Sequence, residues 1–91
     1  MTIKYTKQFL NKLEDIFAES DYVLRYEKGS FKSGYCVLKD TKIAIVNKYY
    51  TTEGKVNVLI DILKSIEIDR TLLSQKNADL LAQLSQTSLK L

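Results

Sequence analysis

The side chains that most often perform acid–base, nucleophilic or zinc chemistry are nearly missing from this chain. It contains no histidine, which is the commonest general base and zinc ligand, and a single cysteine, Cys36. Cys36 falls in a predicted buried strand without a neighbouring base, so we expect an inert thiol. The carboxylates are spread out, with no pair on one obvious pocket wall, at Glu14, Asp15, Asp61, Glu67, Asp69 and Asp79. We therefore expect no catalytic residue, no metal site and no cofactor, and the sequence favours a protein that is not an enzyme.

One group of polar residues could still bind a small anion. Arg25 and Lys32 would supply positive charge, and Asn47 could donate or accept a hydrogen bond beside them. Gly34 lies in the middle of a predicted strand, where the missing side chain would let a ligand come close. Against a site, Glu27 and Lys32 also make an ordinary cross-strand ion pair. The five candidate binding residues are therefore Arg25, Glu27, Lys32, Gly34 and Asn47. They form either the site of a small-anion-binding protein or enzyme, or a sheet end that is only solvated.

Three strands are needed to bring this group together. From 22 to 48 apolar and polar residues alternate with a period of two, which is typical of β-strands. Gly29-Ser30 is typical of a tight hairpin turn, and Asp40-Thr41 gives a second, weaker turn signal. We predict an antiparallel β-meander of three strands, at 22–28, 31–39 and 42–48.

Three helices complete the chain. Apolar residues recur at helical spacing over 6–20 and 52–66, and a leucine-rich helix is predicted over 70–86. Thr6 is a suitable N-cap for the first helix, and Thr51 or Thr52 for the second. We expect a single α+β domain over residues 1–91: a helix, the three-stranded antiparallel meander, then two helices packed on the sheet.

Pairing counted outward from the two turns divides the predicted sheet into two faces. One face carries the polar group at one end and apolar residues at the other, namely Val23, Cys36, Leu38, Ile43 and Ile45. The opposite face is rich in tyrosine, which is common where a buried surface meets a partner. The interface candidates on this face are Tyr22, Leu24, Tyr26, Tyr35, Val37 and Val46. The alternative is that the chain's own first and third helices sandwich the sheet.

The charge distribution leaves two classes of partner open. The net charge is +3, and residues 22–56 carry seven bases against three acids. A basic segment with strand tyrosines could bind single-stranded nucleic acid through Arg25, Lys28, Lys32 and Lys48, although the strand order does not match the RNA-recognition motif. Our leading hypothesis is a non-catalytic protein-interaction module that forms a homodimer or recognises another protein.

The strand segment also carries a resemblance. Residues 25–36, Arg-Tyr-Glu-Lys-Gly-Ser-Phe-Lys-Ser-Gly-Tyr-Cys, and Ile45-Val46-Asn47-Lys48 before the second helix resemble a family of small uncharacterised proteins from Bacteroidetes-type bacteria. The resemblance covers about 22–66 and implies a bacterial cytoplasmic protein, without an activity, cofactor or catalytic residue. The single cysteine and the absence of a long apolar stretch also predict the cytoplasm, with no membrane span.

Overall fold

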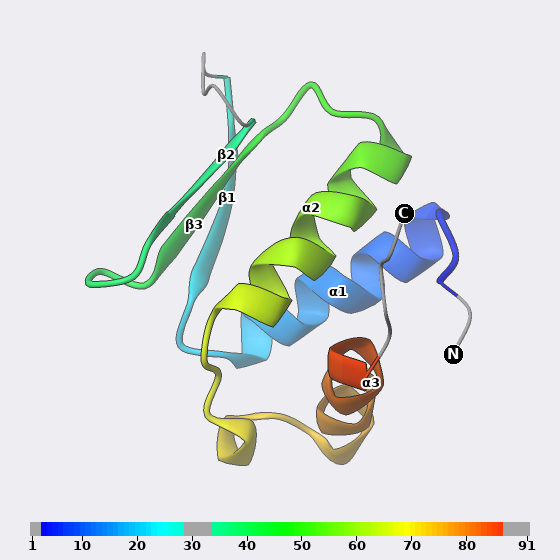
Figure 1. Ribbon diagram of the computed structural model, residues 1–91, viewed down its shortest axis with the longest axis vertical. Coiled ribbons are helices and arrows are strands. Elements are labelled where there is room, and N and C mark those ends of the chain that lie inside the picture. The colour runs from blue at the N-terminus through cyan, green and yellow to red at the C-terminus, as the bar shows by residue number, and fades with distance from the viewer. Residues whose placement is uncertain (1–2, 29–33, 87–91) are drawn as a thin grey trace.

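The computed structural model describes residues 3–28 and 34–86, and they form a helical layer beside a small sheet (Figure 1). The α+β class predicted from the sequence is confirmed. The elements are α1 (Lys7–Glu19), β1 (Val23–Glu27), β2 (Tyr35–Leu38), β3 (Ile43–Asn47), α2 (Thr52–Ser65), a 3₁₀ turn (Arg70–Leu72) and α3 (Gln75–Gln86). The third helix therefore begins later than the predicted 70, because the chain first makes the 3₁₀ turn that Asp69 caps.

Both long helices begin at a threonine that satisfies a backbone amide. The Thr6 hydroxyl accepts a hydrogen bond from the amide of Phe9 (3.1 Å), and the Thr51 hydroxyl accepts one from Gly54 (3.1 Å). Glu53 lies in the first turn of α2, where a negative charge is favourable. The apolar stripes of α1 and α2 meet in the core, where the fully buried side chains include Leu13, Ile16, Phe17, Leu59, Ile60 and Ile62.

The sheet has the order β1–β3–β2, so the predicted meander is wrong in one pairing. β1 lies parallel to β3, with Val23 beside Ile43, and does not pair with β2. The second hairpin has the predicted register, with Leu38 opposite Ile43 and Cys36 opposite Ile45. Alternation along a strand specifies which residues share a face, but not which strand lies next to it. The predicted turn at 29–30 lies outside the described residues.

The division of the sheet into two faces survives the change of strand order. Parallel and antiparallel neighbours both place directly opposite residues on the same side of a sheet, so each strand keeps its predicted inner residues. However, the face that carries the interface candidates is the one on which α1 and α2 pack. There, Tyr22 and Val46 are buried, while half-buried Leu24, Tyr26, Tyr35 and Val37 pack against the core.

The third helix does not cover the sheet as predicted. α3 packs mainly against α1 and α2, on the side of the helical layer away from the strands (Figure 1). Its link to α1 is polar: the buried Asn77 amide donates to Asp15 and Glu19, at 2.9 Å each. The backbone amide of Ser74 also donates to Glu19 (2.8 Å). The two hydrogen bonds that Glu19 accepts, first that from Ser74 and then that from Asn77, lower the pKa of Glu19. Among the described residues, no helix consequently lies on the second face of the sheet.

Candidate functional site

The uncovered side of the sheet, called the open face below, is organised in three rows across the strands. The first row is apolar and consists of Val23, Ile43 and Leu38. The second row consists of Arg25, Ile45 and Cys36. In the third row, Glu27 lies beside Asn47, whose backbone amide donates to the backbone carbonyl of Gly34 (2.9 Å). The open face is thus apolar at one end and polar at the other.

The apolar end of the open face is unusually exposed for its composition. Val23 retains 54% of its surface and Leu38 44%, and Ile43 between them is half-buried. Cys36 is half-buried on this same face, so its strand is less buried than predicted. Neighbouring large apolar residues that stay accessible on one sheet face are typical of an interaction surface, whereas single ones need no explanation.

At the polar end, the described binding candidates bond to one another and to the local backbone. The Arg25 guanidinium forms an ion pair with Glu27 (2.5 Å), and both side chains are well exposed. The Asn47 side-chain oxygen accepts a hydrogen bond from the amide of Tyr49 (2.9 Å), which stabilises the turn after β3. Lys32 lies outside the described residues. Arg25, Glu27 and Asn47 share a face as predicted, but Arg25 and Glu27 pair with each other and Asn47 bonds to the local backbone.

Gly34 does not leave space for a ligand, because Tyr50 fills that space. A Cβ atom on Gly34 would lie 1.6 Å from the Tyr50 hydroxyl oxygen and 2.4 Å from its Cζ atom. Gly34 also has a φ of +81°, a conformation that other residues rarely adopt. The glycine that suggested a binding site is therefore explained by its positive φ, directly before β2, and by the packing of a tyrosine ring.

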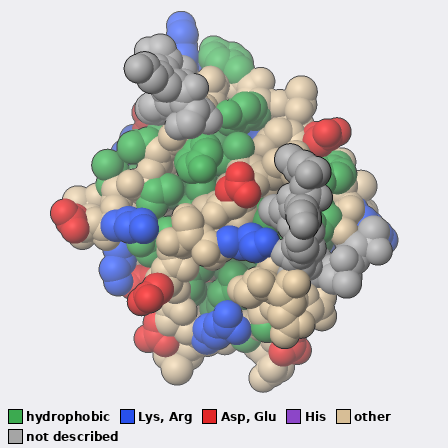
Figure 2. Space-filling model, in the orientation of Figure 1, with side chains coloured by type: hydrophobic (Ala, Val, Ile, Leu, Met, Phe, Trp, Pro, Cys, Tyr) green, Lys and Arg blue, Asp and Glu red, His purple; other side chains and the backbone are tan. Residues whose placement is uncertain are grey.

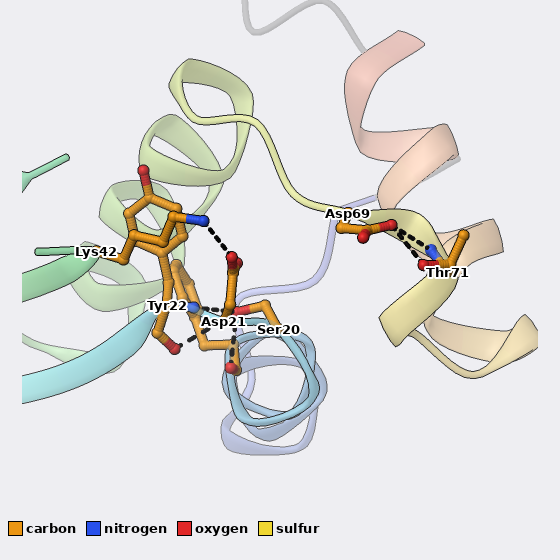
Figure 3. A network of polar contacts seen from close by, with 7 residues as sticks. Ser20, Asp21, Tyr22, Lys42, Asp69 and Thr71 are labelled. Atoms are coloured by element: carbon orange, nitrogen blue, oxygen red, sulfur yellow. Dashed lines mark hydrogen bonds and ion pairs between the residues drawn. The ribbon is translucent and has the colours of Figure 1, made fainter. Parts of the chain in front are cut away.

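Sequence reasoning missed a polar network at the opposite end of the sheet. Lys42 reaches from the turn before β3 to the carboxylate of Asp21, between α1 and β1 (Figure 3). This hydrogen bond, and then the charge of Asp21, raise the pKa of Lys42. Asp69 bonds to the hydroxyl and amide of Thr71, at 2.6 and 3.0 Å, which lower the pKa of Asp69. Lys42 lies 21 positions from Asp21, so no spacing rule would have found the pair.

A second missed feature is a groove between α1 and the outer edge of β1. Its volume is about 590 Å³, within the range of ligand-binding clefts. On its wall the Tyr26 hydroxyl donates to Glu14 (2.6 Å), and Lys55 lies 4.9 Å from the centre of the Tyr26 ring. Burial, and then the hydrogen bond to Glu14, raise the pKa of Tyr26, so this phenol stays protonated when exposed tyrosines ionise.

The positions of the tyrosines bear on the nucleic-acid alternative. Tyr22, Tyr26 and Tyr35 belong to the helix-covered side of the sheet, so none of them offers a stacking surface on the open face. Arg25, the base on the open face, is paired with Glu27. Figure 2 shows Lys and Arg side chains interspersed with Asp and Glu over the face in view, without a large area of one sign. These observations give the nucleic-acid hypothesis no support.

Comparison with models of protein families, with curated proteins and with solved structures found no match to this chain. The resemblance to a bacterial family stays a prediction. Within 3–28 and 34–86, no group of three or more His, Cys, Asp or Glu residues is placed to hold a metal ion. Among the same residues, no helix has both the length and the apolar character needed to cross a membrane.

Proposed function

We propose that this protein is a non-catalytic interaction module that forms a homodimer through the open face of its sheet. The observation that carries the proposal is the apolar row of Val23, Ile43 and Leu38, which no helix within 3–28 and 34–86 covers. Packing this row against the same row of a second copy would remove it from water. Each square ångström of apolar surface removed from water contributes about 25 cal/mol.

A second copy fits this surface because the open face carries both signs of charge. Arg25 and Glu27 lie at its polar end, with side chains that keep 56% and 39% of their surface exposed. A two-fold axis brings the same patch of both copies together, so Arg25 of one copy can approach Glu27 of the other. A partner with one dominant charge would leave either Arg25 or Glu27 facing a like charge.

The size of the face sets the expected strength of the dimer. Three strands of about five residues cover roughly 14 Å by 17 Å, or about 240 Å² in projection. Stable complexes bury about 800 Å² on each partner, so the dimer should be weak. We expect it to appear over a range of roughly 10 µM to 1 mM, which corresponds to about 4–7 kcal/mol of association free energy.

The experiment is a concentration series in sedimentation velocity or light scattering, comparing the native chain with Leu38→Lys and Leu72→Lys. Leu38 and Leu72 are 44% and 48% exposed, but Leu72 lies in the 3₁₀ turn, so it is the matched control. Burying the exposed half of Leu38 contributes about 1 kcal/mol per copy, so its loss from both copies raises Kd about 30-fold. Leu72→Lys should leave Kd unchanged.

The alkylation rate of Cys36 provides a second measurement of the same contact, because Cys36 is the chain's single cysteine and lies on the open face. Its alkylation by a small maleimide should slow as protein concentration rises, and Leu38→Lys should remove that dependence. A native chain that stays monomeric to about 1 mM, at which association would provide only about 4 kcal/mol, would refute the proposal. Equal weakening by Leu38→Lys and Leu72→Lys would also contradict it.

A further inference from the structure

β1 is an edge strand whose outer side has no hydrogen-bonding partner among the described residues. The parallel ladder uses the Val23 amide, which donates to Lys42 (2.9 Å), and the Glu27 carbonyl, which accepts from Lys48 (3.1 Å). Backbone groups alternate in direction along a strand, so Leu24 and Tyr26 turn their amides and carbonyls away from β3. An exposed edge of this kind is a template for another strand.

The groove described above runs along this edge, with α1 as its other wall. Phe17 and Ala18 line it from α1, and Leu24 and Tyr26 line it from β1. A strand added to β1 would therefore place its alternate side chains against the part of α1 that carries Glu14, Phe17 and Ala18, of which Phe17 is 1% exposed. Backbone hydrogen bonds to an edge strand, combined with side-chain contacts to a neighbouring surface, are a recurring mode of peptide recognition.

The charges of the groove indicate the chemistry of its occupant. Glu14 and Asp21 are the charged residues that line it, although the chain as a whole carries +3. Glu14 accepts a hydrogen bond from Tyr26, and Asp21 forms an ion pair with Lys42, which does not line the groove. Asp21 precedes β1, and Glu14 bonds to Tyr26 near the other end of that strand. From Asp21 to Tyr26 an extended chain spans about 17 Å, the length of five residues.

We propose that this groove, between α1 and the free edge of β1, binds an extended segment of a partner protein as an added antiparallel strand. The segment has an apolar residue that faces Phe17 and Ala18, with a lysine or arginine two positions before it and another two positions after it. This surface shares only Val23 with the residues of the open face described above, so the inference does not rest on the proposed homodimer. A second copy is a poor occupant, because pairing β1 with β1 brings two α1 helices toward the same groove.

The test uses the capped peptide Ser-Lys-Thr-Val-Thr-Lys-Ser, with Ser-Glu-Thr-Val-Thr-Glu-Ser as the matched control. When the basic peptide is added, the backbone amide hydrogens of Leu24 and Tyr26 should exchange at least about tenfold more slowly, as measured by NMR. Val23, Arg25 and Glu27 should change little, since their amides already face β3. The acidic peptide should have no such effect.

Changes to the peptide backbone test the strand addition without altering the protein. Residues opposite Leu24 and Tyr26 must donate their own amides, and their side chains face the groove. N-methylation of the valine or of either lysine should therefore weaken binding about tenfold or more, which is about 1.4 kcal/mol. N-methylation of a threonine should have little effect. Equal loss at both sets of positions would overturn the proposal.

Protein variants then separate the groove from the open face. Ala18→Arg obstructs the groove and neutralises its charge, and should weaken binding about tenfold or more. Asn11→Arg adds the same side chain to an exposed position of α1 that does not line the groove, and should bind normally. Leu38→Lys should also bind normally while losing self-association. Equal binding of the acidic peptide, or protection of Leu24 and Tyr26 by self-association alone, would overturn the proposal.

Discussion

Replacing Gly34 by alanine tests the packing of the Tyr50 ring beside Gly34. Its φ of +81° would cost a residue with a Cβ atom about 1–2 kcal/mol. The new Cβ would also lie 1.6 Å from the Tyr50 hydroxyl oxygen, so the ring must move. Overpacking of this kind costs about 1–3 kcal/mol. We expect Gly34→Ala to lower the free energy of unfolding by about 2–5 kcal/mol, a large share of the stability of a small domain.

The assay is urea unfolding followed by circular dichroism, with Gly54→Ala as the matched control. A Cβ on Gly54 would lie 3.1 Å from Tyr50 Cδ1, but Gly54 is in α2, where alanine gains about 1 kcal/mol. Its net change should stay within about 1 kcal/mol. In a Tyr50→Ala background, Gly34→Ala should cost only the backbone term of about 1–2 kcal/mol. A Gly34→Ala change below about 1 kcal/mol in the native background would refute the reasoning.

Three further predictions concern titrating groups. Asn77→Asp brings a third carboxylate beside Asp15 and Glu19. Thermal unfolding at pH 7 should therefore show a free energy of unfolding lower by about 3 kcal/mol, with a smaller loss near pH 4. A loss that does not depend on pH would contradict this. Glu19 has a lowered pKa, so its stabilisation is present above 4.5 and is lost as pH falls through the folded value. Urea unfolding of Glu19→Gln should therefore differ from the native chain at pH 7 and converge with it in acid, and a constant difference would argue against that role. Tyr26 has a raised pKa, so above pH 10 the unfolded chain releases a proton that the folded chain keeps, and stability should fall as pH rises. Tyr26→Phe should remove the part of this loss of stability that Tyr26 causes, and an ultraviolet titration should lose one late-ionising phenol. If Tyr26 instead ionises together with the exposed tyrosines, its hydrogen bond to Glu14 does not keep it protonated.

The sequence predicted the features that depend on neighbouring residues. The helices, the second hairpin and the inner and outer residues of each strand follow from periods of 3.6 and two, which each segment carries by itself. The partner of β1 was not predicted, because Val23 and Ile43 are 20 positions apart and alternation is compatible with either neighbour.

The candidate site was only partly predictable for the same reason. Arg25 and Glu27 share a face because they are two residues apart on one strand. Nothing local indicates that Tyr50 fills the space beside Gly34, or that Glu14 meets Tyr26. Each of these contacts depends on how the helices pack against the sheet. The residues at the apolar end of the open face were predicted to share a face, but the interface was predicted on the opposite, tyrosine-rich face. The placement of the helices decided which face stayed uncovered.

The central position of β3 has a consequence for the order of folding. Leu38 and Ile43 are 5 positions apart, whereas Val23 and Ile43 are 20 apart, so closing the second contact costs about 1.2 kcal/mol more chain entropy. The hairpin of β2 and β3 is therefore the natural first product of strand pairing, and it exposes one side of β3 until β1 arrives. During that interval β3 is the vulnerable edge. In the folded chain both edges of β3 are paired, and the more polar β1 lies at the boundary of the sheet.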